Sequence, residues 1–76
     1  MMDWDQELDA VGLLCPLPVL KTRKRLQQLQ SGQVLRLLVD DPAAVIDVPH
    51  FCNEQGHALM SSDTSATGQV YLIRKG

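Results

Sequence analysis

The chain has 76 residues, of which 45% are hydrophobic and 21% are charged, and its formal net charge is −2 at pH 7. This length suits one compact domain, so we expect a single domain over residues 1–76, with residues 1–6 as a flexible N-terminus. The negative balance argues against stable nucleic-acid binding, and the chain lacks the apolar run of a membrane span and the pattern of a signal peptide. We therefore expect a cytoplasmic monomer that makes no membrane contact.

The first half of the chain predicts a strand, a helix and a second strand. Residues 7–11 form the first strand, which ends at Gly12, and a helix begins after the segment Cys15-Pro16-Leu17-Pro18. Pro16 suits the first helical turn, and Ser31-Gly32 is typical of a stop. Residues 34–40 are apolar on both faces, which is typical of a strand in the middle of a sheet. The inward positions of the helix are Val19, Thr22, Leu26 and Leu29.

The second half predicts another helix and a hairpin. Asp41-Pro42 is a helix start and Gly56 a helix end, and we expect Pro49 to cause a kink or a division into two pieces. Residues 57–62 and 69–75 form antiparallel strands around a turn at residues 63–68. The expected fold is α+β, a two-layer α/β sandwich in the order βαβαββ, with a four-stranded mixed sheet and two helices on one face. The inward positions of the second helix are Ala44, Val48, Phe51 and Cys52.

Cys15 is the candidate reactive residue, because it stands before two prolines at the start of a helix, in the position of an N-cap. The partial positive charge of a helix N-terminus lowers the pKa of a thiol and so favours the nucleophilic thiolate. Pro16 and Pro18 stiffen the turn and should leave the sulfur exposed. The alternative is a buried, inert cysteine, which is common for this residue type.

The sequence predicts no functional site at the other cysteine or at the two histidines. Cys52 lies on the inward face of the second helix, which favours a packed thiol over a disulfide relay with Cys15. His50 and His57 offer no spacing with the cysteines that is typical of a zinc site, so we expect no metal and no cofactor.

A basic group, Lys21, Lys24 and Arg25, lies on one face of the first helix. Such a group is usually a solvated face, and the alternative is a docking surface for an acidic protein or for RNA. Asp9 either orients the loop that leads to Cys15 or faces solvent at the strand.

The segment 9–18 carries a CPxP motif, and further matching segments are Asp40-Asp41-Pro42-Ala43, Asp47-Val48-Pro49, Phe51-Cys52, Gly56-His57 and the ending at residues 71–76. With these motifs, the chain resembles the TusA/SirA-like family of sulfur carrier proteins, and it is closest to the TusA members. The resemblance covers nearly everything from Leu8 onward. Leu14 and Leu17 depart from it, since the TusA members often carry charged residues there.

The resemblance implies that Cys15 accepts sulfur from a cysteine desulfurase as a persulfide, with Asp9, Gly12, Pro16 and Pro18 as the supporting motif. A downstream sulfur-relay protein would then take the sulfur, most simply for 2-thiolation of the tRNA wobble uridine. Molybdenum-cofactor maturation and sulfur oxidation are alternative destinations. The chain would be a sulfurtransferase component rather than a stand-alone enzyme. Two other classes remain open: an RNA- or protein-binding regulatory module that uses the basic helix, and a thiol-disulfide enzyme that uses both cysteines.

Overall fold

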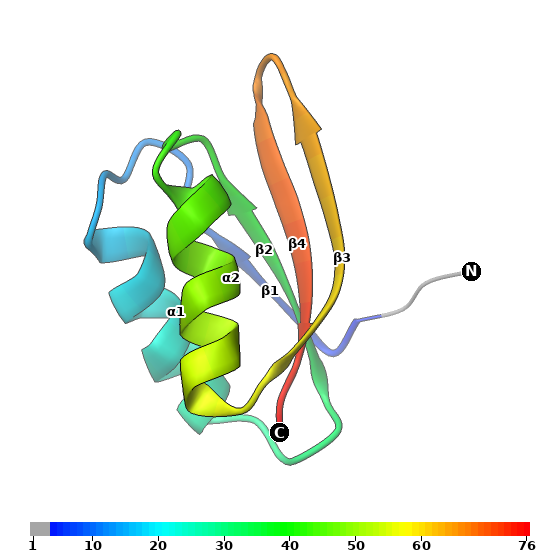
Figure 1. The fold of residues 1–76 in the computed structure, drawn as a ribbon. Coiled ribbons are helices and arrows are strands. Elements are labelled where there is room, and N and C mark those ends of the chain that lie inside the picture. Colours follow the sequence, from blue (N-terminus) through cyan, green and yellow to red (C-terminus); the bar gives the residue numbers. More distant parts are fainter. Residues whose placement is uncertain (1–3) are drawn as a thin grey trace.

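The protein was analysed as a computed structural model, which describes residues 4–76. The described chain forms four strands and two helices in the order βαβαββ, as predicted, and both helices cover the same face of the sheet (Figure 1). Within this part, neither helix is long and apolar enough to cross a membrane. The elements are β1 (Gln6–Asp9), α1 (Leu17–Gln27), β2 (Val34–Val39), α2 (Ala44–Gln55), β3 (Ala58–Ser65) and β4 (Gly68–Arg74).

The sheet is mixed and has the strand order β1-β2-β4-β3. β2 pairs in parallel with β1 and antiparallel with β4, so the predicted central position of residues 34–40 is confirmed. Leu35, Leu37 and Val39 alternate along β2 on the face toward the helices and are almost completely buried. Each buried side chain of this size stabilises the fold by about 1.5–3 kcal/mol.

The core lies between this face and the two helices. α1 contributes Thr22 and Leu26, and α2 contributes Val48, Phe51 and Cys52, all of them buried as the helical spacing predicted. α2 runs as one helix through Pro49, so, of the two alternatives expected there, the division into two pieces is wrong. Packing of the apolar face on both sides of the proline holds the helix together despite the missing N–H.

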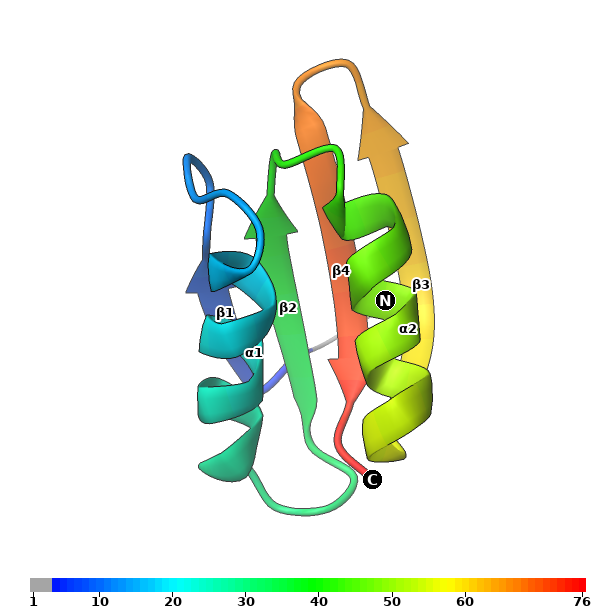
Figure 2. The same ribbon diagram turned by 60° about the vertical axis from the view of Figure 1, so that its left-hand side comes forward.

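The β3–β4 hairpin is longer than predicted. The strands extend to Ser65 and from Gly68, and the hairpin tip projects beyond the ends of both helices (Figure 2). The polar residues around Asp63 are exposed on both faces of the hairpin tip. The sequence there therefore has no alternation of apolar and polar residues, which is the pattern that identifies a strand. Gly68 is required at the turn, because a Cβ atom would lie 2.8 Å from the carbonyl oxygen of Val39.

Residues 1–3 of the expected flexible N-terminus lie outside the described chain. Asp5 pairs with Val34, since its N–H donates to the Val34 carbonyl oxygen at 2.8 Å and its carboxylate accepts from the Val34 N–H at 2.8 Å. Trp4 stacks under the Arg36 guanidinium, 4.6 Å from the ring centroid, on the sheet face away from the helices. From Trp4 onward the N-terminal segment is therefore attached to β2.

Candidate functional site around Cys15

The loop after β1 and the turn after β2 meet at one end of the molecule, because the carboxyl ends of parallel strands lie at the same edge of a sheet (Figure 1). Asp40 and Asp41 join the two segments. An Asp40 carboxylate oxygen accepts the Gly12 N–H at 2.9 Å, and Asp41 Oδ2 accepts the Cys15 N–H at 2.6 Å. The backbone of Cys15 is thus fixed by a residue from a distant part of the chain.

The supporting residues predicted before Cys15 shape the same loop. The Asp9 carboxylate accepts the Val11 N–H at 3.0 Å, which favours its role in orienting the loop. Gly12 has φ +88°, a left-handed conformation that glycine adopts without steric cost. These two residues turn the chain from β1 toward the Asp40 carboxylate and so bring Cys15 to the sheet edge.

Cys15 is exposed, as predicted, but it does not occupy the cap of α1. The helix begins at Leu17, with Pro16 in the cap position, and the Cys15–Pro16 peptide bond is cis. Pro18 is buried in the first turn, and its carbonyl oxygen accepts the Thr22 hydroxyl at 2.7 Å. The N–H of Leu17 donates to the Leu14 carbonyl oxygen at 2.9 Å, so it is already paired within the turn.

The electrostatic surroundings of the thiol differ from the expectation. A hydrogen bond to the Asp47 carboxylate raises the pKa of the Cys15 thiol above its ordinary value, and desolvation and the negative charges of Asp47 and Asp41 act in the same direction. The expectation of a lowered pKa is therefore wrong. It considered the dipole of α1 alone, whereas the fold places carboxylates from the start of α2 beside the sulfur.

A shallow groove runs from the thiol between α1 and α2, and we call it the Cys15 groove. Its apolar part is formed by residues of both helices, and its rim carries His50 and Glu54, whose Nε2 and Oε2 atoms lie 2.6 Å apart. The open shape exposes the sulfur at one end instead of enclosing a substrate. Its lining residues are Cys15, Pro16, Val19, Asp47, His50, Phe51, Glu54 and Gln55.

Asp41 also connects the site to the core. It is buried, its Oδ1 accepts the Ala43 N–H at 3.1 Å, and its carbonyl oxygen accepts the Gln69 side-chain amide at 3.2 Å. The Tyr71 hydroxyl donates to the other end of the Gln69 amide at 3.2 Å, and burial raises the pKa of Tyr71. This chain of hydrogen bonds fixes the position of Asp41 and, through it, that of Cys15.

Cys52 has the buried position predicted for it. It is 2% exposed, it is a free thiol like Cys15, and burial raises its pKa to about 11. The structure therefore gives no support to a relay between the two cysteines. Across residues 4–76, we found no group of three or more His, Cys, Asp or Glu side chains that could hold a metal ion.

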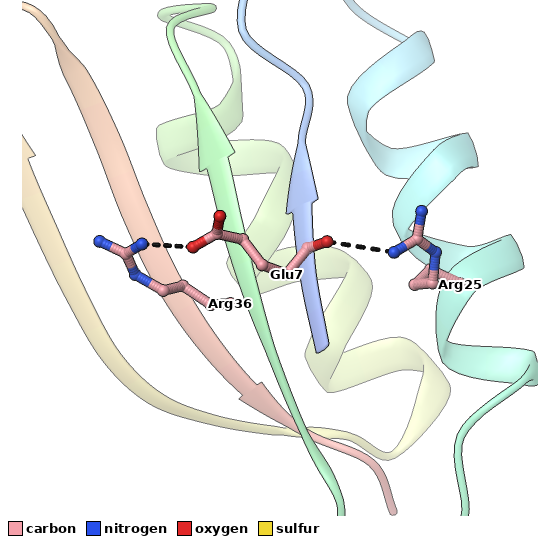
Figure 3. Close-up of polar contacts among 3 residues, drawn as sticks. All are labelled: Glu7, Arg25 and Arg36. Carbon is pink, nitrogen blue, oxygen red and sulfur yellow. Dashed lines mark hydrogen bonds and ion pairs between the residues drawn. The ribbon is translucent and has the colours of Figure 1, made fainter. Parts of the chain in front are cut away.

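The predicted basic group is split. Lys21 and Lys24 are exposed on α1, but the Arg25 guanidinium donates to the Glu7 carbonyl oxygen at 3.1 Å (Figure 3). The Glu7 carboxylate in turn pairs with Arg36 across β1 and β2. Arg25 thus attaches α1 to the edge of the sheet, and the two lysines remain as the freely exposed charges of the group.

Three site residues were missed as such from the sequence: Asp40, Asp41 and Asp47. Asp41 was assigned to the start of the second helix, and all three residues lie in segments that match the family, but none was given a role at the site. A signal was available, because two parallel strands place the residues that follow them at one edge, and Cys15 and Asp41 each follow such a strand. For Asp47 the sequence contains no comparable signal, since its place depends on how α2 packs against the loop.

An exposed cysteine, held in position by backbone contacts on a two-layer α/β sandwich, defines a small protein that presents a single thiol at its surface. The family model described as sulfurtransferase TusA matches residues 6–75, and the chain therefore belongs to this family, with a role in sulfur transfer. A SirA-like protein from Desulfitobacterium hafniense, known from its crystal structure, is 24% identical in sequence to this chain. The match covers 92% of this chain and 95% of that chain, and the TM-score between the two structures is 0.76. That structure has the same fold.

Proposed function

We propose that the protein carries sulfane sulfur as a persulfide on Cys15 in the cytoplasm, between a cysteine desulfurase and a downstream sulfur-relay protein. One observation carries the proposal: in a chain of the TusA family, the cysteine of the CPxP motif is exposed while its backbone is fixed by Asp41. A carrier needs this combination, because donor and acceptor must both reach the same sulfur atom.

The exchange needs no cofactor. The Cys15 thiolate attacks the outer sulfur of a donor persulfide, the donor S–S bond breaks, and its electron pair leaves with the donor thiolate, which takes up a proton. Written with all atoms, Cys15–SH and R–S–SH give Cys15–S–SH and R–SH. Since the reverse exchange discharges the carrier to an acceptor thiol, the protein is a component of sulfur transfer rather than a stand-alone enzyme.

Mass spectrometry after incubation with a cysteine desulfurase and cysteine tests the proposal. We expect a mass increase of one sulfur atom that maps to Cys15 and disappears with a reductant. Cys15→Ser should stay unmodified, whereas Cys52→Ser, the matched control, should load like the wild type. A folded protein that remains unmodified with every desulfurase and rhodanese tested contradicts the carrier function.

For the destination of the sulfur, we propose 2-thiolation of the tRNA wobble uridine. The protein should restore 2-thiouridine in cells that lack their own carrier, and Cys15→Ser should not. Leu14 and Leu17 are 67% and 45% exposed beside the site, so they are placed to affect recognition of the acceptor. Normal loading without restored thiolation would redirect the proposal to molybdenum-cofactor maturation or sulfur oxidation.

A further inference from the structure

The Cys15 groove combines an apolar surface with negative charge. Pro16, Val19 and Phe51 provide the apolar contacts, while Asp47 and Glu54 provide carboxylates. Among the described residues that line the groove, His50 is the one basic side chain. Its Nε2 atom already contacts the Glu54 carboxylate. An occupant that complements this groove is apolar and positively charged.

Asp47 affects whether the Cys15 thiol is protonated or ionised. The thiolate is the nucleophile in sulfur exchange, and an ordinary thiol is only a few per cent ionised near neutral pH. Asp47 lies beside the Cys15 sulfur and favours the protonated form. The free protein therefore holds its sulfur acceptor in the less reactive state.

We propose that the Cys15 groove receives an apolar and cationic segment of the protein that exchanges sulfur with Cys15, and that its cation pairs with Asp47 and thereby releases the thiol for ionisation. This inference rests on the proposed carrier function. As the cation approaches Asp47, the thiol proton passes to water, and the thiolate attacks the outer sulfur of the partner's persulfide. The partner's S–S bond then breaks, and its sulfur leaves as a thiolate that takes a proton from water.

A protein segment fits this groove better than a nucleic acid does. The Asp47 carboxylate would repel phosphate groups, and the lysines that could attract them line a different hollow, together with Leu8, Arg25 and Gln28. The titratable groups that face the thiol and its groove are Asp41, Asp47, His50 and Glu54. Three of these four are carboxylates, so a cation is the complementary partner group.

Alkylation by iodoacetamide, a neutral reagent, tests the role of Asp47 without any sulfur donor. The rate at Cys15 is followed by peptide mass spectrometry from pH 6 to pH 10 for wild type, Asp47→Asn and the control Asp63→Asn. Asp63 undergoes the same chemical change on the exposed part of β3. We expect Asp47→Asn to react about threefold or more faster than wild type at pH 7.5, and Asp63→Asn to match wild type. Asp47→Ser provides a second variant if the amide disturbs folding, and a wild-type rate in a folded Asp47 variant overturns the proposal.

Disulfide exchange at Cys15 tests the occupant, because tethering removes the need for tight binding. The probes are acetyl-cysteinyl-leucyl-arginine amide and its glutamine counterpart, which compete for Cys15 in a thiol-disulfide buffer. We expect the arginine peptide to be favoured by about threefold or more in wild type and Asp63→Asn, and the preference to disappear in Asp47→Asn/Glu54→Gln. Equal preference in the wild type and the double variant overturns the proposal. Neither experiment uses a desulfurase, so a failure of sulfur loading would be recognised separately as a failure of the carrier function.

Discussion

Asp41 uses both carboxylate oxygens at the site. Oδ2 accepts from Cys15 in one segment, and Oδ1 accepts from Ala43 at the start of the next helix. A hydrogen bond to an ionised group contributes more than a neutral one, and a buried donor that loses its acceptor adds a further cost. A single residue therefore links the stability of the loop to the position of the thiol.

We expect Asp41→Asn to lower the free energy of unfolding by about 1–3 kcal/mol, because its NH2 group cannot accept the Cys15 N–H. Urea unfolding followed by circular dichroism measures this. Asp63→Asn, an exposed control on β3, should stay within about 0.5 kcal/mol of wild type. Equal stability of the two variants would show that the Asp41 contacts contribute little.

Cys52 should stabilise the fold by packing and take no part in sulfur transfer. We expect Cys52→Ala to lower the free energy of unfolding by about 1 kcal/mol at neutral pH and to leave loading of Cys15 intact. Loading that is lost in a folded Cys52→Ala protein would favour a relay between two thiols.

The same variant predicts a pH dependence. The folded protein keeps Cys52 protonated up to about pH 11, whereas a thiol in the unfolded chain ionises near pH 8.5. The contribution of Cys52 is thus fully present below about pH 8.5 and is lost as the pH rises toward 11, by roughly 1.4 kcal/mol per pH unit. Unfolding measured from pH 7 to pH 10.5 should show the stability advantage of wild type over Cys52→Ala shrinking, reaching zero near about pH 9 and then reversing in sign; a constant difference would contradict it.

The sequence correctly predicted the exposure of individual residues where their neighbours along the chain determine it. The prolines around Cys15 correctly indicated an exposed sulfur, and helical spacing correctly placed Cys52 in the core. The pKa of Cys15 could not be predicted in this way, because the dominant charge, Asp47, comes from α2. Its approach depends on tertiary packing, which no spacing near Cys15 reveals.

At the scale of elements, α1 has three different surfaces. Thr22 and Leu26 face the core, Lys21 and Lys24 face solvent, and Leu17 and Leu20 expose apolar side chains at 45% and 50%. Arg25 is tied to β1 through Glu7. The helix therefore presents apolar area at the end that carries Cys15 and positive charge from its middle to its last turn.

Reversing the charges of Lys21 and Lys24 should slow sulfur exchange with a partner without changing stability, because solvated charges act mainly in the encounter of two proteins. Adding Arg25→Glu should also destabilise the fold, since this change breaks the contact with β1. Rates at low and moderate salt, together with urea unfolding, separate the two effects. Unchanged rates for Lys21→Glu/Lys24→Glu at every salt concentration would identify the lysines as an ordinary solvated face.

Element order was predictable because apolar periodicity changes clearly between strands and helices. The position of β2 followed from its two apolar faces. The start of α2 was predicted two residues too early, at Asp41 as cap and Pro42 as first helical residue, because a turn over Pro42 and Ala43 precedes the helix at Ala44. The length of the hairpin was not predictable, because residues 63–65 are exposed and polar and are held in β3 by pairing with β4. Backbone pairing of this kind leaves no pattern in the side chains.

The whole molecule has one core, to which both helices and all four strands of the described chain contribute, apart from the projecting hairpin tip. Trp4 and Arg36 lie on the opposite sheet face from that core. Loss of either helix would expose the same apolar sheet face. We therefore propose that residues 1–76 form one cooperative domain.

Tryptophan fluorescence and far-UV circular dichroism should give coincident urea transitions, because Trp4 reports the outer sheet face and the circular dichroism signal reports the helices. Light scattering should give the mass of a monomer. Two separated transitions would contradict a single cooperative domain, and a mass that doubles with concentration would contradict the monomer.

The openness of the Cys15 groove has a consequence for the timing of delivery. A sulfur atom bound at this exposed position is accessible to any small thiol in the surrounding solution, which would remove it by the same exchange. Under the proposed carrier function, the useful lifetime of the loaded protein is set by competition between the acceptor and the small thiols in solution. Efficient delivery requires that a loaded molecule meet its acceptor sooner than it is scavenged, so the abundance of the acceptor determines the yield as strongly as its affinity does.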